Sequence, residues 1–284
     1  MGKMRAFIQF TNERFDPAIH IVMIGLFVLY HLAMGGAIGL FGNPKSLWGL
    51  LFCLSFFFKL RLYDEIKDYQ TDLINNPTRP LPRGLLTLKD VRMAIVATFV
   101  FEFILTMNES GTTKMFTLLA WSYSLLMYKE FFISKFLENK LTTYALTHTF
   151  VVVLLSLRTF SAFTDNPLNF WQSSLACYFC FNVFEFGRKT FTNSEEKKVQ
   201  TYSNIFGKAG AFILTFSQIL VATYLVTLAH NNELSYRLIG VVLTSFILML
   251  PYLMTDKIWA GKLFRSISSI FIILFFITNI TLTF

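Results

Sequence analysis

The chain has 284 residues, of which 54% are hydrophobic and 15% charged, and its formal net charge is +8. A soluble globular domain carries about 25% charged residues, so this composition excludes an ordinary soluble enzyme and indicates an integral membrane protein. The cysteines all lie in apolar stretches. Cys177 and Cys180 lack the second Cys or His pair that a zinc site needs, so we interpret them as small buried hydrophobes.

The first 16 residues are polar and basic, and we interpret them as a cytoplasmic, interfacial segment rather than a removable signal peptide. A spanning helix needs about 20 mostly apolar residues, and nine segments approach this length. They are 19–40, 47–62, 91–107, 115–128, 141–157, 171–187, 209–228, 238–254 and 267–284. These segments predict an all-α, multi-pass membrane protein with nine transmembrane helices, in which residues 1–284 form one domain.

The basic residues give the predicted orientation. With nine spans, all lysines and arginines except Lys45, Lys114, Arg158 and Arg237 fall on the side of the N-terminus. The positive-inside rule places that side in the cytoplasm, together with the two charged loops at about 63–90 and 185–208.

The first charged loop begins as a helix and ends in an Arg-bearing, Pro-rich turn. Asp64, Asp68 and Asp72 recur at i, i+4 and i+8, so they share one helical face. Mg²⁺ prefers oxygen ligands and often binds through one or two carboxylates plus substrate phosphates. Arg79 and Arg83 follow, and guanidinium groups suit phosphate oxygens. This pattern indicates a diphosphate site. The alternative is a solvated loop in which the acids pair with nearby bases, namely Lys59, Arg61 and Lys67.

The second charged loop follows the sixth predicted span and faces the same side. Its charged residues include Glu185, Arg188, Lys189, Glu195, Glu196, Lys197 and Lys198. Two segments that combine acids and bases are therefore expected on one side of the membrane.

With this layout the chain resembles the UbiA superfamily of intramembrane prenyltransferases over essentially its whole length. The family's first motif, Asn-Asp-x-x-Asp-x-x-x-Asp, appears as Asp64-Glu65-x-x-Asp68-x-x-x-Asp72, and an Arg-Pro-Leu-Pro loop begins at Arg79. The family's second motif is Asp-x-x-x-Asp with further acids, then Lys and Ser or Thr. This chain has a variant, Glu-x-x-Arg-Lys followed by Glu and Thr-Tyr-Ser, that is typical of a divergent branch.

The resemblance implies that the helices surround a central cavity. It also implies that Mg²⁺, with Mn²⁺ as an alternative, bridges two acidic groups to one diphosphate. The implied metal ligands are Asp64, Glu65, Asp68, Asp72, Glu185, Glu195 and Glu196. The implied diphosphate-binding residues are Arg79, Arg83, Lys129, Arg188 and Lys189. The expected catalytic residues are Asp68, Asp72, Tyr144 and His148. The expected partners are a prenyl diphosphate, a lipophilic, typically aromatic acceptor and membrane lipids, with no nucleic acid.

Ionisable and polar residues inside membrane segments are functional candidates. Tyr144 and His148 lie at i and i+4, so both can face a cavity, where they would accept a proton or contact the acceptor substrate. The alternative is that His148 only forms a hydrogen bond to a neighbouring helix. Glu102 lies near the outer end of its predicted helix and is expected to extend toward the membrane surface.

Three functions fit these observations. The first is Mg²⁺-dependent transfer of an isoprenyl group to a lipophilic acceptor. The second is a membrane terpene cyclase, in which the carbocation is quenched within its own chain, because a fold does not fix a reaction. The third is an isoprenoid-binding or carrier protein without catalysis. Transporters usually place their charges near the membrane midplane, whereas these acids cluster at the cytoplasmic ends.

Overall fold

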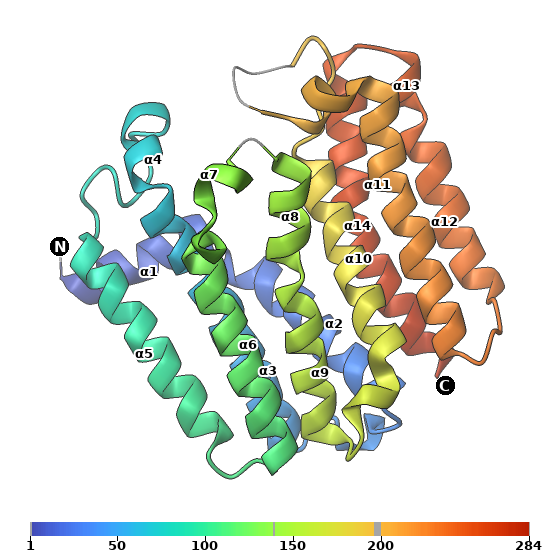
Figure 1. Cartoon of the computed structure of the whole chain (residues 1–284). Helices are drawn as coiled ribbons and strands as arrows, with labels where there is room; N and C mark the ends of the chain where they lie inside the picture. The colour runs from blue at the N-terminus through green and yellow to red at the C-terminus, as the bar shows by residue number, and fades with distance from the viewer. Residues whose placement is uncertain (1, 139, 196–199, 284) are drawn as a thin grey trace.

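The computed structural model describes residues 2–138, 140–195 and 200–283, and these ranges form helices and turns without a strand. The helices, in chain order (Figure 1), are α1 (Lys3–Arg14), α2 (Pro17–Met34), α3 (Pro44–Lys67), α4 (Tyr69–Asn75), α5 (Leu88–Thr106), α6 (Gly111–Tyr128), α7 (Ser134–Leu137), α8 (Leu141–Thr149), α9 (Val151–Phe163), α10 (Trp171–Arg188), α11 (Tyr202–Ala229), α12 (Tyr236–Met249), α13 (Pro251–Met254) and α14 (Ile258–Leu282). Short 3-10 turns lie at Ile38–Leu40, Glu130–Phe132 and Pro167–Phe170. The predicted all-α class is confirmed.

Local sequence determines where several helices begin. The Asp16 side chain accepts hydrogen bonds from backbone N–H groups of the first turn of α2, and Pro17 occupies the first helical position. Asn43 caps α3 in the same way, ahead of Pro44. Proline suits this position because its missing N–H would have no intrahelical partner there.

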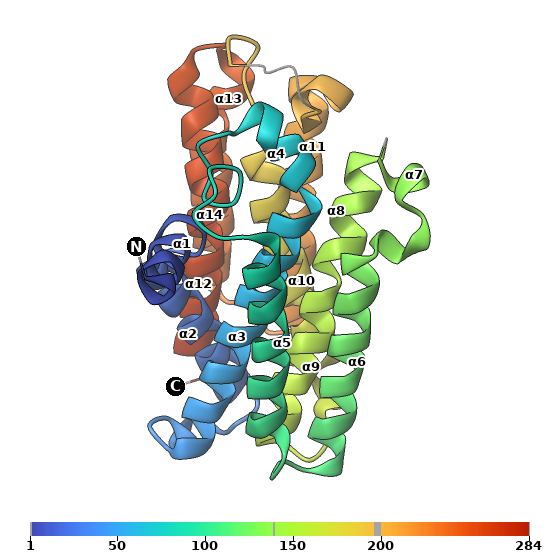
Figure 2. The same ribbon diagram turned by 90° about the vertical axis from the view of Figure 1, so that its left-hand side faces the viewer.

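The long helices pack side by side, and α10 lies near the centre of the bundle. It contacts α9, α11 and α14, while α2 contacts α3, α9 and α14. A side chain at Gly187 of α10 would collide with Ser268 of α14, so glycine permits this close crossing. The short helices α4, α7 and α13 lie toward the same end of the bundle, the upper end in both views (Figures 1 and 2). We call this the charged end.

Six helical segments are long and apolar enough to cross a membrane: 17–34, 44–67, 141–163, 202–229, 236–254 and 258–282. The helices α5, α6 and α10, which were also predicted to span, do not meet that criterion of length and composition within the described residues. The chain is an integral membrane protein, and the count of nine spans stays a prediction.

Glu102 is fully buried between α3, α5 and α6, and the expectation that it extends toward the membrane surface is wrong. Its carboxylate accepts hydrogen bonds from Lys59 Nζ at 2.5 Å and from Trp121 Nε1 at 2.6 Å. The Lys59 ammonium also lies 4.0 Å from the centre of the Phe99 ring. A buried charge requires such partners, and this network fixes how the three helices meet.

Candidate functional site

A cavity of about 880 Å³ lies between the helices and reaches the charged end. Its volume is typical of a site for a small molecule. Further along the same helices its wall is apolar, formed by residues that include Met23, Phe57, Met127, Val151, Val152, Phe181, Ile272 and Ile273. Toward the charged end its wall carries acids and bases, namely Arg14, Arg61, Asp64, Lys67, Asp68, Arg79, Glu138, Glu185, Arg188 and Lys189. The cavity is therefore amphipathic along its length.

Asp64 and Asp68 present their carboxylates to this cavity from the end of α3. The Asp68 N–H donates to the Asp64 carbonyl and the Asp72 N–H to the Asp68 carbonyl, each at 2.8 Å, so the helical spacing persists across the junction with α4. Loss of solvation in the cavity wall, and then the negative charge of Asp72, raise the pKa of Asp68. The carboxylates of Asp64 and Asp68 both face the cavity, and two neighbouring negative charges favour a cation between them.

Asp72 does not line the cavity. It is 3% exposed, and both of its oxygens accept from Arg79 Nη1 at 2.6 Å. Arg79 in turn lines the cavity mouth. In this structure Asp72 therefore positions an arginine, and its predicted roles as metal ligand and catalytic residue stay predictions.

Glu65 binds two arginines that line the cavity, Arg14 and Arg61. Its carboxylate is almost fully buried and accepts from Arg14 Nε and Arg61 Nη2, each at 2.6 Å. Because Arg14 belongs to α1, this arrangement fastens α1 to α3. Glu65 does not line the cavity.

Glu185 and its two basic neighbours form the opposite charged wall, at the end of α10. Glu185 accepts from Arg188 through two hydrogen bonds of 2.5 and 2.9 Å, and Lys189 Nζ lies 3.4 Å from its Oε1. All three residues line the cavity. An anion entering here would meet two cations, Arg188 and Lys189, that share the Glu185 carboxylate.

Glu195 extends to α14, away from the cavity. Its Oε1 accepts from Arg265 Nη2 at 2.6 Å, and this hydrogen bond lowers the pKa of Glu195. A side chain at Gly261 would collide with the carboxylate, so glycine makes room for it. Glu196 lies outside the described residues.

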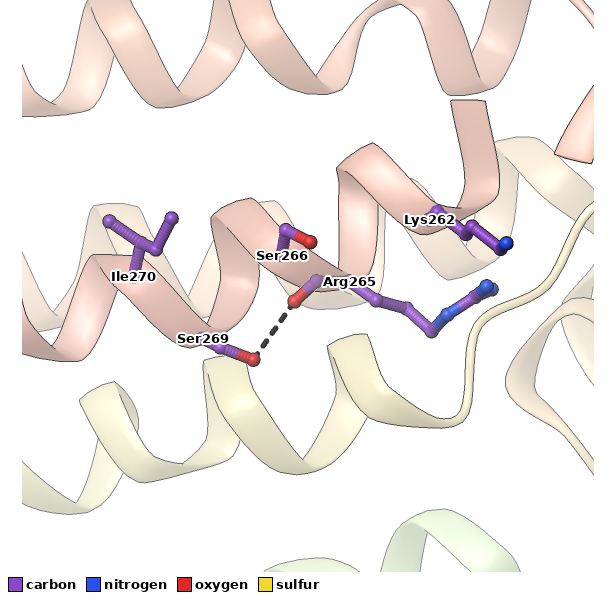
Figure 3. Close-up of a pocket in the computed structure, with 5 residues that line it drawn as sticks. All are labelled: Lys262, Arg265, Ser266, Ser269 and Ile270. Atoms are coloured by element: carbon purple, nitrogen blue, oxygen red, sulfur yellow. Dashed lines mark hydrogen bonds between the residues drawn. The ribbon is translucent and has the colours of Figure 1, made fainter. Parts of the chain in front are cut away.

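Arg265 also borders a second, shallow pocket of about 470 Å³ on α14 (Figure 3). Lys262 and Arg265 lie at one end of this pocket, and Ser269 and Ile270 at the other. Ser269 and Ile270 also line the central cavity. The two hollows are therefore neighbours along α14.

Two predicted diphosphate-binding residues lie apart from the cavity. Arg83 donates to both oxygens of Glu13 on α1, at 2.9 and 2.7 Å. The Lys129 ammonium lies 5.3 Å from the centre of the Tyr128 ring. Neither side chain lines the cavity wall.

Tyr144 and His148 both line the cavity, and their rings stack with centroids 3.8 Å apart. They lie on α8, just before the helix is interrupted at Phe150. Tyr123 of α6 donates to the Thr147 carbonyl at 2.8 Å, and Tyr178 of α10 to the Leu146 carbonyl at 3.3 Å. These hydroxyls stabilise the backbone at the interruption, as buried helix breaks in membranes require.

The sequence interpretation missed Lys67, Arg61 and Arg14 as cavity residues and considered the first two only as partners that neutralise acids. Lys67 lies three residues after Asp64, and Arg61 three before it, so helical periodicity already places them beside that carboxylate. Arg14 had no comparable signal, because its position depends on how α1 packs.

Asp64, Asp68 and Glu185, three of the four acids that line the cavity, carry the hard oxygen ligands that Mg²⁺ prefers. Among the described residues, no three His, Cys, Asp or Glu side chains gather closely enough to hold a metal by themselves. Asp64, Asp68 and Glu185 are cavity side chains that could each contribute an oxygen ligand to a metal.

The fold and site define a helical integral membrane protein with a central cavity that is charged at one end. No protein-family model and no curated protein matches the chain. A solved structure of digeranylgeranylglyceryl phosphate synthase in membranes does match, with a TM-score of 0.65, over 99% of this chain and 98% of that chain, at 14% identity. That synthase is an intramembrane prenyltransferase of the UbiA superfamily. This match shows that the two chains share a fold, as the predicted resemblance implies.

Proposed function

We propose that this chain is a UbiA-type enzyme that transfers an isoprenyl group from an allylic prenyl diphosphate to a lipophilic acceptor in the membrane. The observation that carries the proposal is the polarity of the cavity, which is charged at one end and apolar further along. A prenyl diphosphate has the same polarity, with an anionic head and a hydrocarbon tail. The fold shared with a membrane prenyltransferase supports the proposal.

The head of the substrate would lie between the two charged walls. Arg79, Arg188 and Lys189 can exchange their present carboxylate partners for diphosphate oxygens, which guanidinium groups bind in pairs. Asp64, Asp68 and Glu185 would hold Mg²⁺, or Mn²⁺, together with those oxygens. The bound metal would supply Lewis-acid stabilisation of the departing diphosphate.

The apolar part of the cavity would hold the isoprenoid tail and exclude water. Phe57 and Phe181 stack there with centroids 5.6 Å apart. Their ring faces suit a developing allylic cation, which benefits from cation–π contact where water is absent. Such a wall also protects the cation from hydrolysis before an acceptor attacks.

We propose that the charged end faces the cytoplasm, because the basic residues gather on that side and the positive-inside rule then applies. The diphosphate head would enter from water, while the tail and the acceptor would come from the lipid. The six apolar helical segments support insertion in the membrane.

The test uses purified full-length protein in detergent with Mg²⁺ and C10, C15 and C20 allylic diphosphates, with and without lipophilic alcohols and phenols. Diphosphate release and the extracted products are measured. We expect acceptor-dependent transfer that is lost in Asp68→Asn and with EDTA, and retained in the control Asp165→Asn, an exposed acid outside the cavity.

Two other results would replace this proposal. A cyclic hydrocarbon or terpene alcohol formed without an acceptor, and lost in Asp68→Asn, would identify a terpene cyclase. Tight binding of a prenyl diphosphate with no release under any condition would identify a carrier.

A further inference from the structure

One face of α14 is exposed along the length of the helix, and its chemistry changes in a fixed order. In chain order this face carries Trp259, Lys262, Ser266, Ile270, Leu274 and Ile277, all of which are exposed. These residues recur every three or four positions, so they share one side of the helix. Because α14 is long and apolar enough to cross a membrane, this side would contact lipid. It begins with an aromatic and a basic residue, continues with a hydroxyl and ends with aliphatic side chains.

Trp259 and Lys262 indicate where this face meets the lipid headgroups. Tryptophan is enriched at the membrane–water interface, and a lysine near a helix end extends its ammonium to that interface. Both residues lie near the start of α14, directly after α13 at the charged end (Figure 1). In the shallow pocket of Figure 3, the side chains of Lys262 and Arg265 extend toward the start of α14, and Ile270 lies at the other end. The pocket is therefore polar at headgroup depth and apolar further into the membrane.

The positive charge of Lys262 is not neutralised by a described acid. Asp256, close to the start of α14, binds Lys208 Nζ at 2.9 Å. Glu195 binds Arg265 Nη2 at 2.6 Å. The acids of this region that the structure describes thus have other partners, and an exposed ammonium is left at the polar end of the pocket.

We propose that this pocket binds the phosphate of an anionic phospholipid, and that one acyl chain of the lipid lies along Ile270, Leu274 and Ile277. The lipid is bound and not converted, so the inference goes beyond the proposed prenyl transfer. Lys262 would attract the phosphate, and the Ser266 hydroxyl would donate to an oxygen of the headgroup or of the ester. Basic pockets on membrane helices bind anionic headgroups in this way. The pocket volume of about 470 Å³ is typical of a site for a small molecule.

Arg265 would contribute less than Lys262. Its Nη1 donates to the Thr190 carbonyl and to Glu195, and its Nη2 donates to Glu195. Its charge is therefore shared with a carboxylate. Its Nε makes no hydrogen bond to a described residue, and it remains available to a phosphate oxygen. The electrostatic preference of the site should thus depend mainly on Lys262.

The stripe favours a lipid over a free anion. An exposed ammonium holds a free phosphate weakly, because ion pairs in water contribute little. A phospholipid gains in addition from its acyl chain, which would lie against Ile270 and Ile277. Since head and chain are covalently linked, binding of one raises the effective concentration of the other. The polar and apolar halves of the stripe would then act together.

The experiment measures lipid binding to the purified full-length protein in detergent by native mass spectrometry. Palmitoyl-oleoyl phosphatidylglycerol is compared with the matching phosphatidylcholine, which has the same chains and no net charge. We expect the first phosphatidylglycerol to bind about fivefold more tightly, which is the effect of one basic residue near an anionic headgroup. Added inorganic phosphate, at the same ionic strength, should not displace it.

Variants assign the preference to this pocket. Lys262→Met should remove the preference for phosphatidylglycerol, and Lys262→Arg should keep it. Ser266→Trp leaves every charge in place but fills the pocket, so it should lower the affinity for phosphatidylglycerol to the level of Lys262→Met. The control is Lys89→Met, which removes an exposed lysine at the start of α5, outside the pocket. Unfolding temperatures in detergent should stay close to that of wild type, because these positions are exposed.

Equal affinity of the wild-type protein for the two lipids would overturn the inference, as would an unchanged preference in Lys262→Met. An equal loss of preference in Lys89→Met would also overturn it, because the effect would then belong to the net charge of the protein. Displacement of phosphatidylglycerol by inorganic phosphate would assign the pocket to a free anion instead. None of these results depends on turnover, so failure of the proposed prenyl transfer would leave the inference standing.

Discussion

The two acidic segments of the chain have similar composition but are used differently. In the first, Asp64 and Asp68 stay on a nearly continuous helix, and both face the cavity. In the second, α10 ends at Arg188, so Glu185 faces the cavity while Glu195 lies beyond the helix and binds Arg265 on α14. Asp64 and Asp68, one helical turn apart, share a site, whereas Glu195, in a turn beyond the helix, binds a cation on another helix.

The first segment also contains acids of both kinds. Glu65 and Asp72 each hold arginines, and in doing so they fix α1 and the loop around Arg79. Asp64 and Asp68 thus face the cavity, whereas Glu65 and Asp72 hold the segments around it in place. The predictions below test that separation.

The largest expected effect concerns Glu185 and Glu195. We expect Glu185→Gln to lower diphosphate release by more than the roughly 10–100-fold that outer-shell partners of metal ligands contribute. Glu195→Gln should leave release within about threefold, measured on equal amounts of folded protein, because Glu195 lies outside the cavity. Equal losses in both variants would contradict the separation.

Next in size is the effect of Glu65 on stability. Glu65→Gln leaves Arg14 and Arg61 without their carboxylate. Breaking a fully buried ion pair costs about 3–5 kcal/mol, and the partial exposure of Arg61 reduces this to about 2 kcal/mol. Thermal unfolding in detergent measures the change. Full stability combined with lost turnover would instead make Glu65 part of the active site.

The pH dependence of stability should have opposite signs at Asp68 and Glu195. The raised pKa of Asp68 means that its ionised form destabilises the fold, so Asp68→Asn should be more stable than wild type at pH 7. This advantage should shrink as the pH falls through the raised pKa toward about 3.9.

Glu195 behaves in the opposite way. Its lowered pKa contributes stability above the unfolded value of about 4.3, which is lost as the pH falls through the folded value. Glu195→Gln should therefore be less stable at pH 7 and equal to wild type at low pH. Unfolding temperatures from pH 7 to 3.5, measured with EDTA, test both signs. If Asp68→Asn and Glu195→Gln changed stability at pH 7 in the same direction, the assigned environments of the two acids would be contradicted.

The smallest effect is expected at the exposed pair of Glu13 and Arg83, whose side chains are about one-third exposed. Surface ion pairs contribute little and are screened by salt. Glu13→Gln should leave the unfolding temperature nearly unchanged at 0.5 M salt. A large drop that persists in salt would show that α1 depends on this contact.

Several site residues followed from the sequence because local periodicity fixes them. The spacing of Asp64 and Asp68, and that of Tyr144 and His148, places each pair on one face of its helix, and all four line the cavity. The binding partners of Glu65, Asp72 and Glu195 could not be predicted from the sequence. Each is held by an arginine, and which cation is in reach depends on chain packing.

The sequence by itself determined the helical class, the membrane setting and the positions of the two charged segments, because apolar length and helical period are local properties. Only the tertiary structure decided which acids face the cavity, that Glu102 is paired inside the bundle, and that Lys67 meets His148 across two helices. These contacts join residues that lie far apart in the chain, and the packing of the helices brings them together.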